Sequence, residues 1–202
     1  MIGKKELDWL KRDKYGGKEV GLRVHLKSDL TRLKKGEPLD YVIGWREFLG
    51  CKIDLSSHPL IPREETEFWV GEAIKDLGAK LRELGSLAPK SSFTKSCQLK
   101  TLDLFAGSGC IGLAILKHCP NIQMTFGEKD EKFVNQIRKN LKLNKLKARV
   151  VQADVFAPRG QSFGSSSRTV FGAKFDIIFA NPPYIPTKQK VQKSVKNWEP
   201  KS

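Results

Sequence analysis

Four consecutive residues, Asn181-Pro182-Pro183-Tyr184, place an amide, two prolines and a phenol directly after an apolar run that ends at Ala180. Proline lacks an N–H group, fixes φ and keeps the preceding residue extended, so these residues end a strand and leave carbonyl groups free to accept. A planar NH2 group, of an amide or of a nucleobase, offers two N–H donors, which the Asn181 side-chain oxygen and the Pro182 carbonyl can accept. Tyr184 can cover that planar group with its ring. The pattern predicts a site that holds a poorly nucleophilic NH2 nitrogen in line for group transfer. The alternative is that these residues form only a rigid turn.

A glycine-rich stretch provides a second candidate site. Gly107-Ser108-Gly109-Cys110-Ile111-Gly112 matches G-x-G-x-x-G between an expected strand and an expected helix. Glu128 ends the next expected strand about 20 residues further on, where a carboxylate that binds ribose hydroxyls is expected. The pattern predicts a nucleotide-type cofactor, with a plain strand-to-helix turn as the alternative, and leaves NAD and S-adenosylmethionine both open.

Two further acids favour S-adenosylmethionine. Asp103 lies within the strand before the loop, where its carboxylate can meet a positively charged aminoacyl or sulfonium group but would repel a pyrophosphate. Asp154 follows the third expected strand and can accept from an adenine amino group, with Val155 and Phe156 as apolar neighbours; a simple turn residue is the alternative. Open α/β sheets bind ligands along the carboxyl ends of their strands, so Asp103, Glu128 and Asp154 at three successive strand ends predict one cofactor crevice.

The elements that must position these residues alternate along the chain. Strands are expected at 99–105, 122–127, 148–152 and 174–180, with helices at 110–118 and 130–143. Such alternation predicts βαβ crossovers and a parallel α/β sheet. Upstream, we expect a hairpin over 41–55 that turns at a glycine, and a helix over 63–84 with Phe68, Ile74, Leu77 and Leu81 on its apolar face. Residues 1–37 are expected to form a basic arm with short helices, and residues 157–174 a Gly/Ser-rich surface loop.

Composition narrows the classes of protein. The 202 residues carry 37 Lys and Arg against 22 Asp and Glu, a net charge of +15, which favours RNA or an acidic protein as partner, although a solvated lysine-rich surface is equally compatible. The four cysteines show neither zinc-ligand spacing nor a disulfide framework, so we expect no metal and reduced thiols. The N-terminus lacks the apolar run of a signal peptide, which predicts a soluble cytoplasmic protein without a membrane partner, a monomer by default.

At this point the sequence resembles the peptide chain release factor glutamine methyltransferases, the HemK/PrmC family, over most of residues 32–202. The resemblance rests on the N-P-P-Y motif together with "GEPLDYVIGWREFLG" at 36–50, "LIPREETE" at 60–67 and "NWEP" at 197–200. It implies a Rossmann-like class I methyltransferase sheet and S-adenosylmethionine-dependent methylation of the Gly-Gly-Gln glutamine amide in release factors. It also implies that the cofactor loop consists of Phe105, Ala106, Gly107, Ser108 and Gly109, that Glu128 binds the ribose, and that Asp154 and Val155 contact the adenine. The implied glutamine site consists of Asn181, Pro182, Pro183 and Tyr184, with Asn181 also next to the cofactor.

The resemblance divides the chain into a reduced helical arm (1–37), a linker hairpin (38–62) and a methyltransferase domain that lacks its last strands (63–202), as in a fragment of a longer product. Nucleic acid amino-methyltransferases share N-P-P-Y, and Phe105-Ala106 in place of the usual Gly-Thr is more familiar in guanine-N2 ribosomal RNA enzymes. An RNA or DNA methyltransferase acting on guanine-N2 or adenine-N6 is therefore the alternative function. A third hypothesis is a basic binding module without turnover.

Overall fold

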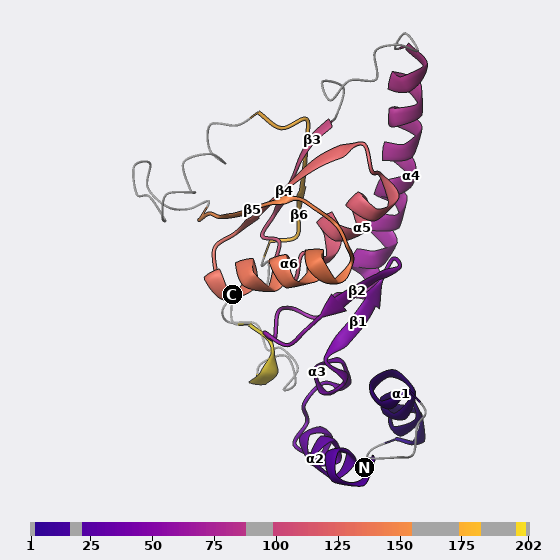
Figure 1. The fold of residues 1–202 in the computed structure, drawn as a ribbon, viewed down its shortest axis with the longest axis vertical. Coiled ribbons are helices and arrows are strands. Elements are labelled where there is room, and N and C mark those ends of the chain that lie inside the picture. Colours follow the sequence, from indigo (N-terminus) through magenta and orange to yellow (C-terminus); the bar gives the residue numbers. More distant parts are fainter. Residues whose placement is uncertain (1–2, 17–21, 88–98, 155–173, 183–196, 201–202) are drawn as a thin grey trace.

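The second half of the chain folds as alternating strands and helices. The computed structural model describes residues 3–16, 22–87, 99–154, 174–182 and 197–200. The alternating elements are β3 (Leu99–Leu104), α5 (Cys110–His118), β4 (Ile122–Glu128), α6 (Glu131–Leu143), β5 (Arg149–Gln152) and β6 (Ile177–Ala180) (Figure 1). Their four strands form one parallel sheet, which confirms the predicted α/β class, although β6 begins three residues later than expected.

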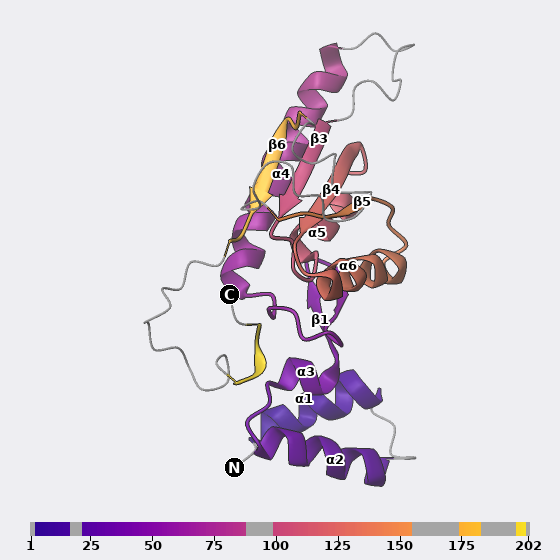
Figure 2. The same ribbon diagram turned by 90° about the vertical axis from the view of Figure 1, so that its left-hand side faces the viewer.

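The strand order in this sheet is β5-β4-β3-β6, so the chain moves outward from β3 to β5 and then returns to the other side of β3. The crossovers through α5 and α6 run in the same direction across the sheet, and their common right hand places both helices on one face. Figure 2 shows these helices against the strands. Phe126 of β4, Leu113 of α5 and Ile137 of α6 are fully buried between the two layers, where apolar burial stabilises the sheet.

Upstream of this sheet, the expected hairpin is present but shorter than predicted. β1 (Trp45–Phe48) and β2 (Cys51–Asp54) pair antiparallel around Leu49 and Gly50, whose φ values of 45° and 76° are those of a two-residue turn with both central residues left-handed. The prediction that strand structure begins at Tyr41 was wrong. Residues Leu39–Ile43 form α3, a short helix that follows Pro38 and ends at left-handed Gly44, whose N–H donates to the Asp40 carbonyl at 2.8 Å.

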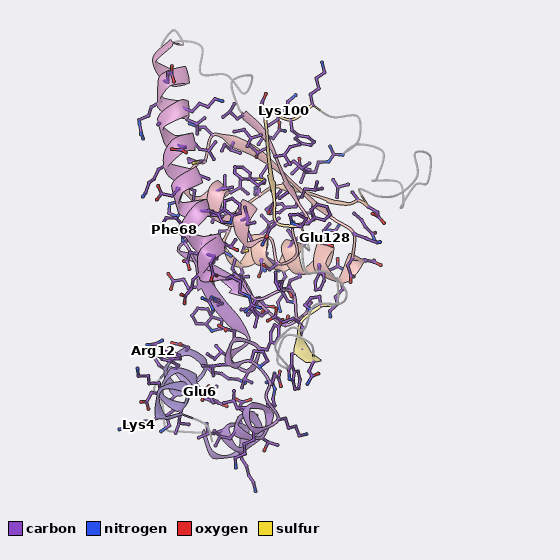
Figure 3. All side chains as sticks on the ribbon, turned by 180° about the vertical axis from the view of Figure 1, so that it is seen from behind. Lys4, Glu6, Arg12, Phe68, Lys100 and Glu128 are labelled. Carbon is purple, nitrogen blue, oxygen red and sulfur yellow. The ribbon has the colours of Figure 1, made fainter. Side chains whose placement is uncertain are left out.

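The long helix α4 (Glu64–Leu87) extends three residues beyond the predicted end at Leu84. Its predicted apolar face included Phe68, which was wrong: Phe68 is 72% exposed and lies on the outer side of α4 (Figure 3). Leu77 is buried as predicted, and Ile74 and Leu81 pack against the core. Val70 is also buried, because it lies roughly 200° around the helix from Phe68. None of the helices formed by described residues, α4 included, is both long and apolar enough to cross a membrane.

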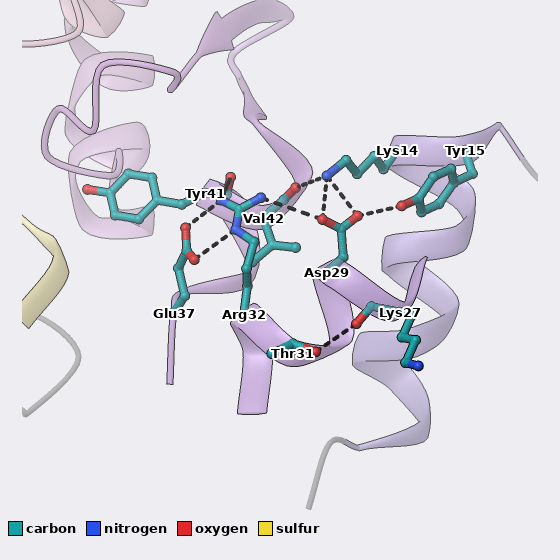
Figure 4. Close-up of polar contacts among 9 residues, drawn as sticks. All are labelled: Lys14, Tyr15, Lys27, Asp29, Thr31, Arg32, Glu37, Tyr41 and Val42. Carbon is teal, nitrogen blue, oxygen red and sulfur yellow. Dashed lines mark hydrogen bonds and ion pairs between the residues drawn. The ribbon is translucent and has the colours of Figure 1, made fainter. Parts of the chain in front are cut away.

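The N-terminal arm contains α1 (Lys4–Tyr15) and α2 (Leu22–Lys34), which lie at one end of the long axis in Figure 1. Asp29 of α2 is 4% exposed and joins them, because its carboxylate accepts from Lys14 Nζ at 2.8 Å and from the Tyr15 hydroxyl at 2.5 Å (Figure 4). Lys14 also donates to a carbonyl of α3, and Arg32 donates to Glu37. A buried polar cluster thus fixes the arm to the start of the linker.

Candidate active site

The glycine loop between β3 and α5 has the backbone of a close-approach turn. Phe105, Gly107 and Gly109 all adopt left-handed φ values, of 58°, 54° and 78°, so the chain reverses sharply before Gly109 caps α5. Gly112 serves packing instead: a Cβ atom there would lie 2.4 Å from Phe126 Cε1, which only glycine avoids. The loop glycines therefore open the backbone toward a ligand, and Gly112 seats α5 directly on β4.

Asp103 lies in β3 beneath this loop and is fully buried. Its Oδ2 atom accepts from the Gly112 N–H at 2.9 Å, while Oδ1 has no hydrogen-bond partner among the described residues. Burial is the main cause that raises the pKa of Asp103 to about 8; the hydrogen bond from the Gly112 N–H lowers this pKa, and the nearby charge of Glu128 raises it. The structure thus places a carboxyl group with one unused oxygen at the start of the loop, where a cation would relieve its desolvation.

Glu128 ends β4 and bends back toward the loop, where Figure 3 labels it. Its Oε2 atom accepts from the Gly107 N–H at 2.8 Å, and Oε1 accepts from the backbone N–H groups of Lys129 and Asp130 at 2.8 and 3.0 Å. Each carboxylate oxygen has two lone pairs, so Oε2 keeps capacity for one more donor, such as a hydroxyl group. Glu128 and the glycine loop are therefore in direct contact.

Asp154 follows β5 at the same edge of the sheet. Its side chain is 11% exposed and its Oδ2 atom lies 2.9 Å from Lys129 Nζ, so this carboxylate is already paired with a cation. The residues predicted to flank it, Val155 and Phe156, lie outside the described residues, as does the expected surface loop over 157–174.

Asn181 and Pro182 follow β6, which pairs with β3 in a register that sets Leu104 opposite Ala180. Asn181 therefore emerges beside the first residue of the glycine loop. Here the order of strands reverses, and such switch points are where open α/β sheets bind their ligands. The side chain of Asn181 is partly exposed and Pro182 is exposed, so both are accessible; Pro183 and Tyr184 lie outside the described residues.

Three amide side chains, two on α6 and one at its C-cap, contribute to this region and were missed in the sequence. Gln136, Asn140 and Asn144 stand four residues apart and hydrogen-bond the backbone of the β2 strand and the turn after it. Asn140, fully buried, accepts from the Asp54 N–H at 2.8 Å and donates to the Ser108 carbonyl of the glycine loop at 2.9 Å. This amide ladder, defined as these three residues, therefore connects the linker hairpin to the glycine loop.

A second long-range contact joins two residues that are 136 positions apart in the sequence. The Arg63 Nη2 atom, at the start of α4, donates to both carboxylate oxygens of Glu199 at 2.5 and 2.7 Å. The Glu199 side chain is 2% exposed, and neighbouring Trp198 packs against the core. The Tyr41 hydroxyl donates to the Pro59 carbonyl at 2.6 Å, and burial raises the Tyr41 pKa, to which Glu199 also contributes. Residues 197–200 are thus held against the linker.

Known proteins similar to this chain share its sequence over long stretches. The methyltransferase small domain family matches residues 83–198, more than half of the chain. A release factor glutamine methyltransferase of Geobacter sulfurreducens is 28% identical over 211 residues (98% of this chain, 64% of the relative). One of Thermodesulfovibrio yellowstonii is 34% identical over 177 residues (87% and 55%). The chain spans less than two thirds of the length of these curated relatives.

Solved structures give a weaker likeness. The N-terminal domain of human METTL16 is 20% identical, covers 72% of this chain and 50% of its own, and has a TM-score of 0.44. The family assignment rests instead on the sequence match, with which the parallel sheet and its glycine loop agree. The chain belongs to the methyltransferase small domain family and has the class I methyltransferase fold.

Proposed function

We propose that this chain transfers a methyl group from S-adenosylmethionine to the glutamine side-chain amide in the Gly-Gly-Gln motif of a peptide chain release factor. The observation that carries the proposal is the position of Asn181 and Pro182, which follow β6 beside the glycine loop at the switch point of the sheet. The acceptor is supported by the relatives of this chain, which are named release factor glutamine methyltransferases.

The donor side of the site fits this cofactor. When bound, S-adenosylmethionine supplies an electrophilic methyl group on a positively charged sulfur. The loop from Phe105 to Gly109 offers backbone for close approach, and the free lone pair of Glu128 Oε2 can accept from a ribose hydroxyl. The buried, unpaired Asp103 Oδ1 supplies negative charge beneath a cationic ligand. Asp154 would accept from the adenine amino group after exchanging its partner Lys129.

On the acceptor side, the Asn181 side-chain oxygen and the Pro182 carbonyl would each accept one N–H of the glutamine amide. Two such bonds orient the nitrogen and favour the positive charge that grows on it as the methyl group arrives, since the amide lone pair is delocalised and weakly nucleophilic. The amide proton becomes acidic only after transfer, so no general base has to act first. The predicted covering ring is that of Tyr184.

The test is mass spectrometry of the Gly-Gly-Gln peptide after the 202-residue chain, S-adenosylmethionine and a release factor are incubated together. We expect one added methyl group on the glutamine. Asn181→Ala should reduce kcat/KM by roughly 10²- to 10³-fold, whereas Asn121→Ala, an exposed asparagine ahead of β4, should leave it unchanged. Calorimetric titration should show binding of S-adenosylmethionine and none of NAD.

The alternative function, amino-methylation of RNA or DNA, is examined in the same experiment with radiolabelled cofactor and nucleic acid in place of the release factor. Label in nucleic acid with an unmodified release factor would refute the proposed acceptor. Label in neither acceptor, despite cofactor binding, would refute methyl transfer by this chain.

A further inference from the structure

The positive charge of the chain is concentrated at the end of α6 and the start of β5. Residues 138–149 contain six basic residues and no Asp or Glu, namely Arg138, Lys139, Lys142, Lys145, Lys147 and Arg149. These 12 residues therefore contribute +6 of the net charge of +15. All six side chains are exposed, and Arg138, Lys142 and Lys147 line one depression; the surface around it is here called the α6–β5 surface.

Most of this charge is not neutralised within the described residues. Lys139 pairs with Asp54, with Nζ and Oδ2 2.8 Å apart. Arg138, Lys142 and Lys147, in contrast, form no ion pair with any described acid; the one side-chain contact of Arg138 is a hydrogen bond to Asn135. Like charges held close together without counter-charges favour binding of an anionic partner.

The α6–β5 surface is also hollowed. A depression of about 340 Å³ has Arg138, Lys142 and Lys147 among its lining residues. Its other lining residues are aliphatic: Leu141, Leu146, Ala148 and Val150. The volume is at the lower end of the roughly 300–1,000 Å³ that bound small molecules occupy. A depression lined by basic and aliphatic side chains suits a chain with charged phosphates and apolar sugar and base faces.

This surface lies away from the methyl transfer site. The strands are parallel, so β5 begins at Arg149 on the edge opposite to the carboxyl edge that carries Glu128, Asp154 and Asn181. Helix α6 starts at Glu131, just after the end of β4, and runs back toward the start of β5 (Figure 1). A partner bound there leaves the cofactor loop and Asn181 accessible.

We propose that the α6–β5 surface binds the phosphate backbone of RNA without sequence preference. Arginine binds phosphate through its planar fork and lysine binds it as a point charge, so Arg138, Lys142 and Lys147 all suit a phosphate backbone. The aliphatic lining offers no base-edge partners, which leaves backbone contacts as the binding mode. The choice of RNA over DNA rests on the proposed function, because release factors work on the ribosome.

The experiment is a fluorescence anisotropy titration of a labelled 20-nucleotide mixed-sequence RNA with the 202-residue chain over a range of KCl concentrations. The test variant is Arg138→Gln/Lys142→Gln/Lys147→Gln. The matched control, Lys4→Gln/Lys5→Gln/Arg82→Gln, removes the same charge from exposed positions of α1 and α4. Thermal melts verify that all three proteins are folded, as is expected for exposed substitutions.

We expect the test variant to lose at least about tenfold in affinity and to show a log K against log[salt] slope that is shallower by about 2, because each single-strand phosphate contact contributes about 0.7. The control should change affinity by less than about twofold, and polyglutamate of equal charge should compete poorly. Equal losses in the two variants, tighter binding of DNA of the same sequence, or equal competition by polyglutamate would each overturn the proposal.

Release factor methylation measured on the same proteins separates this proposal from the proposed function. The test variant should methylate the release factor at the rate of the unmodified chain, because its substitutions lie at the opposite edge of the sheet from Asn181. If the unmodified chain fails to methylate but binds RNA as described, the proposed function fails while the RNA surface stands.

Discussion

The buried carboxyl of Asp103 predicts that cofactor binding releases a proton. With a pKa raised to about 8 by burial, this group holds about 0.9 proton at pH 7 in the free protein. A cationic cofactor bound above it favours the carboxylate and so lowers that pKa. Binding at pH 7 should therefore release close to one proton, and affinity for S-adenosylmethionine should rise about tenfold per pH unit up to pH 8.

The assay is calorimetric titration with S-adenosylmethionine in two buffers of different ionisation enthalpy, since the difference between the two heats counts the protons released. Asp103→Asn should abolish proton release and the pH dependence of affinity while leaving the acceptor for the Gly112 N–H in place. Identical heats in both buffers for the unmodified chain, or unchanged proton release in the variant, would refute the role given to Asp103.

The raised pKa of Asp103 also makes the stability of the fold decrease as the pH rises. Asp103 keeps its proton in the folded state between roughly pH 4 and 8 while the unfolded chain loses it, so the free energy of unfolding should fall by up to about 1.4 kcal/mol per pH unit in that window. Urea unfolding of the unmodified chain and of Asp103→Asn at pH 5 and 8 measures this, and a parallel pH dependence in the two proteins would contradict it.

Three further predictions concern a packed glycine, an ion pair and a hydrogen-bonded tyrosine. Gly112→Ala should destabilise the chain by about 1–3 kcal/mol in urea unfolding, because its Cβ would overlap Phe126. The control Gly78→Ala in α4 should be neutral or stabilising, because a Cβ there meets only the end of Arg82 at 3.6 Å. Similar results for the two variants would contradict this view of α5 packing. Arg63→Met and Glu199→Gln should show a coupling of about 1 kcal/mol or more in a double-mutant cycle of unfolding, while additive effects would mean that the buried ion pair is not formed in solution. Burial, and after it the hydrogen bond to Asp29, raises the pKa of Tyr15 to about 12, so Asp29→Asn should lower that pKa. A near-ultraviolet titration of tyrosinate measures it, and an unchanged titration in the variant would place Tyr15 away from Asp29.

Sequence patterns predicted the sheet and the positions of its acids because both depend on local order along the chain. The apolar runs separated by helical segments predicted the four strands, and the glycine spacing predicted the loop at Gly107 and Gly109. The amide ladder was missed because glutamine and asparagine on a helix are usually solvated. A signal was present, since Gln136 and Asn140 directly precede Ile137 and Leu141 and so lie toward the buried face of α6.

Other features depend on parts of the chain that are distant in sequence. Arg63 and Glu199 are 136 residues apart, and no periodicity connects them. Phe68 was assigned to the buried face of α4 because of its apolar type, although its angular position differs from that of the correctly predicted Leu77; Val70 is buried in its place. Tyr41 was assigned to a strand on its aromatic character, although Pro38 before it and Gly44 after it are helix boundary residues.

Asn140 couples the ordering of the linker hairpin to the ordering of the glycine loop. Its amide bonds the hairpin at Asp54 and the loop at Ser108 simultaneously, so ordering either partner reduces the entropy that the other still has to lose. By reciprocity, an acceptor protein that docks on the hairpin would strengthen cofactor binding by the same factor by which the cofactor strengthens docking. If the proposed function holds, this single buried side chain couples the binding of the methyl donor to the binding of the acceptor.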